Sequence, residues 1–303
     1  MSAEVLALTR WEWFKLRRRR LPWILLLVNV LLMQITFWAS YGLYRAGDAI
    51  TLGVDPSTGI VGAVPPEVLA LPNSAVFGLL TSHGFLAMLI MILTAPVTAA
   101  GYRSGTTPPV RGVSDARWLF LASKLLLIML LGAGATLVGT LSVTLSSQIA
   151  YAALEGGRGL AANAAWGEVI RTFAKVVYGL LPWICLAAFF AVLTKSTRIA
   201  IGLSIGYAVV ESIVFESLAG FEWAERVSGF VMSWAIDDWL GSTEAQLASI
   251  GFGDDSSLGT AAAAAAQADA LRGFLVSLAY IVVLSGLAFW LFQRRDIAGA
   301  KGE

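Results

Sequence analysis

The sequence predicts an all-α integral membrane protein with six transmembrane helices, and three observations support this fold class. The chain is 57% hydrophobic and 14% charged, whereas soluble domains carry about 25% charged residues. Six apolar runs have about the 20-residue length that a helix needs to cross a bilayer. Basic residues gather in alternate segments between these runs. Helices are expected because backbone polar groups in lipid must be satisfied within their own segment.

We expect spans at residues 21–44, 74–100, 119–146, 172–194, 199–218 and 273–292, in a single domain that covers 1–303. The first run follows basic residues, as in a signal peptide. It is longer than the apolar region of about 7–15 residues in a cleaved signal, so we expect a retained span. The fifth run has the weakest apolar character because Glu211 and Glu216 interrupt it.

The basic residues indicate the orientation of the chain. With both termini in the cytoplasm, most of its 21 lysines and arginines, but few of its 20 acidic residues, lie on the cytoplasmic side. These basic residues are Arg10, Lys15, Arg17, Arg18, Arg19, Arg20, Arg103, Arg111, Arg117, Lys124, Lys195, Arg198, Arg294, Arg295 and Lys301. The positive-inside rule favours this topology.

Two longer segments are then extracytoplasmic. Residues 47–71 form a loop punctuated by glycine and proline, and residues 221–271 are acidic. Within the acidic segment, Phe230–Leu240 is apolar but too short to span, so we expect it at the interface or in a re-entrant position. The alanine run Ala261–Ala266 has high helix propensity and predicts a short helix that leads into the last span.

Residues 101–118 form a polar cytoplasmic loop with a distinctive pattern. It contains Tyr102-Arg103-Ser104-Gly105-Thr106 and Gly112-Val113-Ser114, and Lys124 follows in the next span. This pattern resembles the loop E-Y-R-x-G-T…G-x-S-R…K between the second and third spans of ABC-2 type transporter permeases. Gly101 replaces the glutamate of that pattern, and Asp115-Ala116 separates the serine from Arg117.

Both ends of the chain resemble the same family. Arg10–Arg20 is similar to the connecting helix that precedes the first span in these permeases, so we expect an interfacial helix on the cytoplasmic surface within residues 1–20. Phe292-Gln293-Arg294-Arg295-Asp296 looks like the closing F-x-R-R-D of the family. A passive positive-inside anchor would carry similar charges in both places.

The resemblance implies a permease subunit of an ATP-binding cassette exporter for an amphipathic small molecule, peptide or lipid-like compound, in a prokaryotic inner membrane. It implies two copies of a separate P-loop ATPase that bind ATP and Mg, and a second permease copy or a paralogue. The residues expected to dock the ATPase are Arg10, Lys15, Tyr102, Arg103, Gly105, Thr106, Arg111, Ser114 and Arg117. The chain itself has no G-x-x-x-x-G-K-[ST], so we expect no cofactor on it and no enzyme activity of its own.

Polar residues within the spans are costly and often line a cavity or contact a partner. Asn29, Gln34, His83 and Glu211 are therefore candidates for a substrate path, although interhelical hydrogen bonds would explain the first two equally well. Glu211 has no evident partner at its depth, whereas Glu216 is expected to pair with Lys175.

Gly202-Leu203-Ser204-Ile205-Gly206 fits two motifs. As G-x-x-x-G it predicts a helix-packing face formed by Gly202 and Gly206. As G-x-S-x-G it lacks the strand-turn-helix context of a nucleophile elbow. Two other function classes stay open: an intramembrane enzyme based on Ser204 and His83 or on Glu211, and a non-transporting sensor or anchor. No H-E-x-x-H or cysteine pair indicates a metal site, and we expect no nucleic-acid partner.

Overall fold

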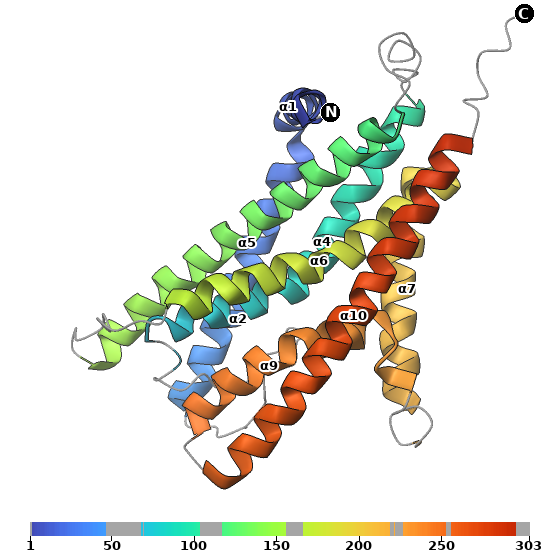
Figure 1. The fold of residues 1–303 in the computed structure, drawn as a ribbon. Helices are drawn as coiled ribbons and strands as arrows, with labels where there is room; N and C mark the ends of the chain where they lie inside the picture. Colours follow the sequence, from blue (N-terminus) through green and yellow to red (C-terminus); the bar gives the residue numbers. More distant parts are fainter. Residues whose placement is uncertain are drawn as a thin grey trace, which may run out of the picture.

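The structure is a computed structural model of the 303-residue chain that describes residues 2–46, 68, 70–103, 117–155, 166–218, 221, 227–252 and 256–294. The described residues form helices and contain no strand (Figure 1). The helices are α1 (Ser2–Arg17), α2 (Arg20–Ala46), α4 (Asn73–Arg103), α5 (Arg117–Glu155), α6 (Trp166–Thr194), α7 (Thr197–Leu218), α9 (Met232–Phe252) and α10 (Ser256–Arg294). Six of these are long and apolar enough to cross a membrane. The predicted all-helical class is thus confirmed for the described residues, and six of their helices have the length and composition predicted for spans.

The span boundaries agree closely with the apolar runs for the first two spans, which cover Arg20–Leu43 and Asn73–Ala99. The third and fourth are longer than predicted, at Trp118–Ala153 and Trp166–Thr194. The third helix continues past residue 146 through Ser147 and Gln148, because polar side chains are compatible with a span where they face a neighbouring helix rather than lipid. Gln34 and Ser146 illustrate this with a hydrogen bond between α2 and α5.

Helices α4 and α6 form the centre of the bundle. In the most apolar 18-residue stretch of each helix, 78% of the residues are buried in α4 and 67% in α6. The corresponding values are 17% in α2, 17% in α7 and 11% in α10. Large side chains that are fully buried in this centre include Phe77 and Met91 of α4, Ile128 of α5, and Leu180 and Ile184 of α6. The peripheral helices therefore present apolar surface outward, as expected for helices that face lipid.

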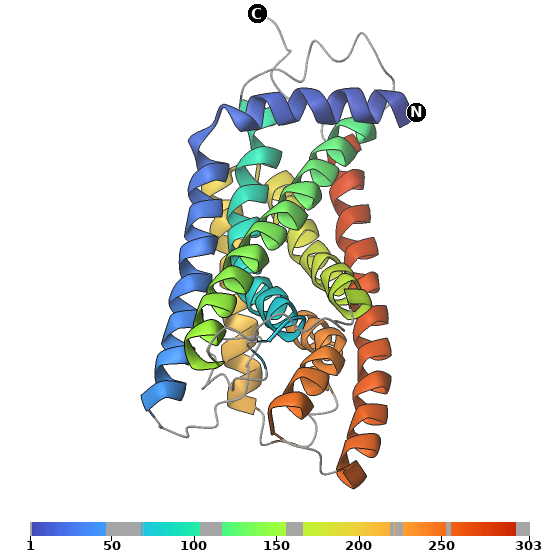
Figure 2. The ribbon, with the colours of Figure 1, turned by 90° about the vertical axis from the view of Figure 1, so that its left-hand side faces the viewer.

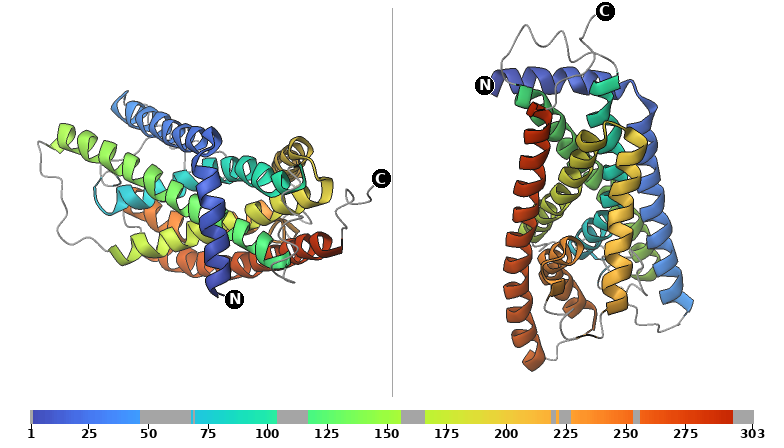
Figure 3. Two further views of the ribbon diagram at one scale, coloured as in Figure 1. Left: turned by 90° about the horizontal axis from the view of Figure 1, so that it is seen from above. Right: turned by 90° about the vertical axis from the view of Figure 1, so that its right-hand side faces the viewer.

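Helix α1 lies across one end of the bundle instead of extending α2 in line (Figure 2). The chain bends at residues 18–19 between the two helices, where the Arg19 amide donates to the Leu16 carbonyl at 2.9 Å. Viewed from above, α1 crosses over several of the other helices (Figure 3, left). The last turn of α10 lies at this same end, so the first and last spans run in opposite directions.

Helix α9 is longer than the sequence predicted. We expected a short re-entrant or interfacial helix around Phe230–Leu240, whereas α9 is a 21-residue helix in the half of the bundle away from α1 (Figures 1 and 2). Its residues Met232, Ile236 and Leu240 are buried in the core. Asp238 of α9 pairs with Arg272 of α10 at 2.7 Å.

Helix α10 begins at Ser256 and continues without a break through the last span. The expected short helix over Ala261–Ala266 is thus the first part of a 39-residue helix. At the other short connection, α6 and α7 form a hairpin in which Lys195 adopts a left-handed conformation with φ of 54°. Its amide donates to the Ala191 carbonyl at 3.1 Å and closes the end of α6.

Candidate functional site at the α1 end of the bundle

A single buried face attaches α1 to the bundle. Thr9, Glu12 and Leu16 are 8%, 6% and 3% exposed, and their spacing of three and four residues places them on one side of the helix. Trp11 and Phe14 are exposed on other sides. Sequence reasoning missed this face because two of its three members are polar, so that the apolar residues alone form no stripe.

Lys124 of α5 is buried where α1 crosses the bundle. Its Nζ donates to the Val97 carbonyl of α4 at 2.9 Å and lies 4.5 Å from the centre of the Phe120 ring. Glu12 of α1 interacts electrostatically with this ammonium group and pairs with Lys15 at 3.2 Å. The lysine that follows the loop pattern in the sequence therefore connects α4 and α5 beneath α1.

The residues predicted to dock an ATPase fall in three structural classes. Gly105, Thr106, Arg111 and Ser114 lie outside the described residues. Tyr102 and Arg103 form the end of α4 and Arg117 begins α5, but their side chains are also outside the description. Arg10 is exposed and Lys15 partly exposed on α1. The structure therefore places only the two ends of the loop, at the end of α4 and the start of α5. Both ends lie next to α1, the helix that carries Arg10 and Lys15 (Figure 2).

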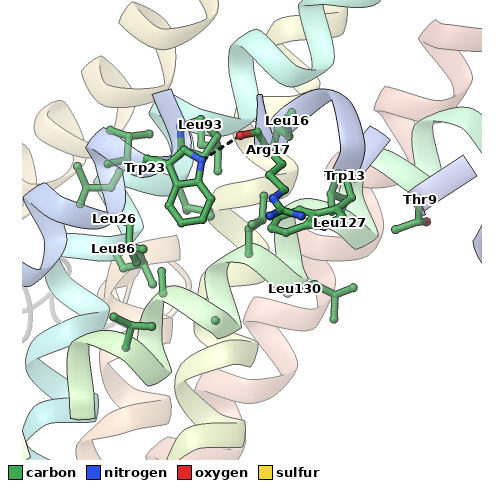
Figure 4. Close-up of a pocket in the computed structure, with 18 of the residues that line it drawn as sticks. Thr9, Trp13, Leu16, Arg17, Trp23, Leu26, Leu86, Leu93, Leu127 and Leu130 are labelled. Atoms are coloured by element: carbon green, nitrogen blue, oxygen red, sulfur yellow. Dashed lines mark hydrogen bonds between the residues drawn. The ribbon is translucent and has the colours of Figure 1, made fainter. Parts of the chain in front are cut away.

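A cavity of about 680 Å³ opens beneath α1, between α2, α4 and α5 (Figure 4). We call it the lateral cleft. Its lining consists of Thr9, Arg10, Trp13, Leu16, Arg17, Pro22, Trp23, Leu25, Leu26, Leu86, Leu89, Ile90, Leu93, Leu127, Leu130, Leu131, Gly134, Ala135 and Val138. At its α1 end the Trp23 Nε1 donates to the Arg17 carbonyl at 3.1 Å and stabilises the bend between α1 and α2. The volume is typical of ligand pockets, which span about 300–1,000 Å³.

Asn29 and Gln34 face α5 within the same chain. The Asn29 Nδ2 donates to the Ala135 carbonyl at 3.4 Å, and the Ser146 Oγ donates to the Gln34 Oε1 at 2.7 Å. Gly139 of α5 permits this close approach, because a Cβ there would lie 2.9 Å from the Asn29 Nδ2. These residues hold α2 against α5 and do not line the lateral cleft.

Glu211 of α7 caps the first turn of α9. Its Oε1 accepts hydrogen bonds from the backbone amides of Met232 at 2.7 Å and Ser233 at 3.3 Å, and from the Tyr207 hydroxyl at 3.3 Å. A carboxylate that accepts free amides at a helix start is stabilising there. The sequence alone did not indicate this role because the partner amides lie 21 and 22 residues further along the chain, in a different helix.

His83 and Ser204 are buried in different environments. A Cβ on Gly179 of α6 would lie 2.9 Å from the His83 Nε2, so the imidazole packs tightly against that glycine. Neither ring nitrogen makes a hydrogen bond of good geometry with a described residue. The Ser204 Oγ donates to the Ala200 carbonyl at 2.7 Å. No hydrogen bond therefore joins Ser204 to His83 in the structure as described.

The other two predicted contacts lie at the periphery. Gly202 and Gly206 have open space where a Cβ would project, so their face of α7 packs against no described part of the chain. The Glu216 side chain, the expected partner of Lys175, lies outside the described residues. The Lys175 Nζ donates to the Thr243 Oγ1 of α9 at 2.9 Å and lies 5.3 Å from the centre of the Trp239 ring.

The predicted polar residues of the spans thus do not converge, since Asn29, Gln34, His83 and Glu211 all lie outside the cleft lining. The α1 end combines a buried lysine, a basic helix and an apolar cleft, and is the candidate functional site. The chain matches no protein-family model, no curated protein and no solved structure.

Proposed function

We propose that this chain is the permease subunit of an ABC-2 type exporter driven by a separate ATPase. The burial of Lys124 beneath α1 carries the proposal. The resemblance connects three features that are far apart in the sequence: the N-terminal basic helix, the polar loop and this lysine. The structure packs α1 over the start of α5, beside the end of α4 that leads into the loop. A force applied to the loop would act on α1 and α5 together.

In this proposal the α1 end faces the cytoplasm and α1 lies at the inner surface of a prokaryotic plasma membrane. The exposed Trp11, Trp13 and Phe14 suit the headgroup layer, and the run Arg17–Arg20 suits an anionic surface. Helix α9 is then re-entrant from the outer side, because its first turn is capped inside the bundle by Glu211.

The partners in this proposal are two copies of a P-loop ATPase, which carry ATP and Mg, and a second permease copy or a paralogue. The open face of α7 supports a role in the permease pair. Gly202 and Gly206 are uncovered there, and Leu203 and Val210 are 42% and 60% exposed. Asn29 and Gln34 of α2 already make their hydrogen bonds with α5 of the same chain. ATP binding would close the ATPases and open a path for an amphipathic substrate between the permeases.

Purification of the tagged chain in mild detergent from its native host tests this proposal. We expect a P-loop ATPase to co-purify with the wild type and to be lost from the variant Arg111→Glu/Arg117→Glu. The matched control Arg45→Glu/Arg171→Glu reverses two exposed charges at the other end of the bundle and should retain the ATPase. Retention by the loop variant would refute the docking site, and absence of an ATPase from the wild type would refute the transporter assignment.

A further inference from the structure

The lateral cleft is apolar along its length and polar at one end only. Leucines from three helices form its walls, including Leu26 of α2, Leu89 of α4 and Leu130 of α5. The polar and charged side chains of the lining are Thr9, Arg10 and Arg17, and all three come from α1. The cleft therefore has the polarity of an amphipathic molecule, with an apolar body and a charged end.

The cleft is open on the outer surface of the bundle. Trp23 and Leu130 line it and are both 52% exposed, and Val138 is 43% exposed. Because α2 and α5 are spans, this surface faces the hydrocarbon of a bilayer. Molecules of the bilayer therefore reach the cleft sideways, without passing through water.

The charged end of the cleft fits an anion. Arg10 and Arg17 are seven residues apart, which is two helical turns and places them on the same side of α1. Neither guanidinium pairs with a carboxylate among the described side chains. Guanidinium groups bind phosphate in a bidentate manner. Figure 4 shows the Arg17 guanidinium beside Trp13 and Leu127, where the apolar wall begins.

We propose that the lateral cleft binds an anionic phospholipid of the surrounding bilayer. One acyl chain lies along the leucines of α2, α4 and α5, and the headgroup phosphate contacts Arg10 and Arg17. The indole rings of Trp13 and Trp23, amphipathic groups that prefer the headgroup level, flank the junction between the two parts. The lipid fills the cavity between α2, α4 and α5 beneath α1, so it adds packing that holds α1 and α2 in place. This site is independent of transport.

The headgroup contact is tested with the purified chain in nanodiscs of equal phosphatidylglycerol and phosphatidylcholine that share the same acyl chains. Native mass spectrometry measures the lipid that stays bound to the protein after the protein is released from the nanodisc. We expect the wild type to retain phosphatidylglycerol preferentially. Arg10→Gln/Arg17→Gln should lower the preference by about twenty-fivefold, because phosphatidylglycerol lacks the cationic choline that offsets the phosphate charge, and each arginine in contact with that net charge contributes roughly fivefold. The control Arg18→Gln/Arg19→Gln removes the same charge outside the lining and should leave it unchanged.

The acyl-chain contact is tested with Gly134→Phe. Gly134 lines the cleft, and a Cβ there meets no atom within 4 Å, so the ring would fill the cavity. We expect about tenfold less retained lipid of either headgroup, since each buried methylene contributes roughly fourfold to binding. Gly286→Phe, at an equally open site on α10, should retain lipid as the wild type does.

Three results would overturn the lipid site. They are equal retention of both lipids by the wild type, equal loss in both arginine pairs, or undiminished lipid in Gly134→Phe. Absence of any bound lipid from the wild type would indicate that another occupant, such as a segment of a second copy of the chain, fills the cleft. An ATPase that fails to co-purify leaves the lipid measurement unaffected, so the two proposals fail separately.

Discussion

Gly273→Ala tests the packing of α9 against α10. Gly273 lies where α10 crosses α9, and a Cβ built on it would collide with the Ala235 carbonyl oxygen and lie 2.8 Å from the Trp239 amide nitrogen. Both neighbours are backbone atoms, so no rotamer change relieves the contact and the two helices must separate. Gly286 is the matched control on the same helix, because a Cβ there meets nothing within 4 Å.

The expected magnitudes follow from two opposing effects. Overpacking costs about 1–3 kcal/mol, whereas replacing glycine by alanine within a helix gains about 1 kcal/mol. Gly286→Ala has only the gain, so the two variants should differ by about 1–3 kcal/mol in stability. For a chain of this size that difference corresponds to about 2–5 °C in melting temperature.

The assay is the loss of the monodisperse size-exclusion peak after heating in detergent, with both variants purified in parallel. Gly273→Ala should melt below the wild type and Gly286→Ala at or above it. Equal melting temperatures for the two variants would refute the close contact between α9 and α10.

Variants at three further positions test other contacts by the same thermal assay or by proteolysis. Glu211→Ala should lose about 1–2 kcal/mol of stability because the first turn of α9 loses its cap. Glu211→Gln keeps an acceptor oxygen for the Met232 amide and should stay close to the wild type in stability. An equal loss of stability in both variants would indicate a role for the charge. Glu12→Lys replaces the carboxylate that pairs with Lys15 by a cation on the buried face of α1, and an uncompensated buried charge costs about 3–5 kcal/mol, so chymotrypsin should cleave α1 faster than in the control Glu168→Lys. Lys195→Gly should raise the melting temperature, since glycine avoids the cost of about 1 kcal/mol of a left-handed residue; a lower value would contradict the observed φ.

The spans could be predicted from the sequence because the hydrocarbon thickness fixes the length of an apolar run. The spans that begin at Arg20 and Asn73 agree with their runs within one residue. Helix α9 was harder to predict because its stability comes from distant contacts. Glu211 supplies its cap and Arg272 pairs with its Asp238, so the polar groups of α9 are satisfied by residues of other helices.

The candidate site was only partly predictable. The basic character of α1 and the position of Lys124 after the loop are visible in the sequence, but the buried face through Thr9 and Glu12 carries no apolar signal. The lateral cleft depends on the angle between α2 and the helices α4 and α5, which no local pattern encodes. Arg10 was predicted as an ATPase contact and also lines this cleft.

ATP hydrolysis by the assembly that purifies with the tagged chain tests the central proposal most directly. We expect the assembly to hydrolyse ATP in the presence of Mg, and a substitution of the P-loop lysine in the co-purified subunit to abolish the activity. The chain purified alone should hydrolyse none, because it has no P-loop. If the tagged chain purifies as a single polypeptide that hydrolyses no ATP under every mild condition, the permease proposal is contradicted.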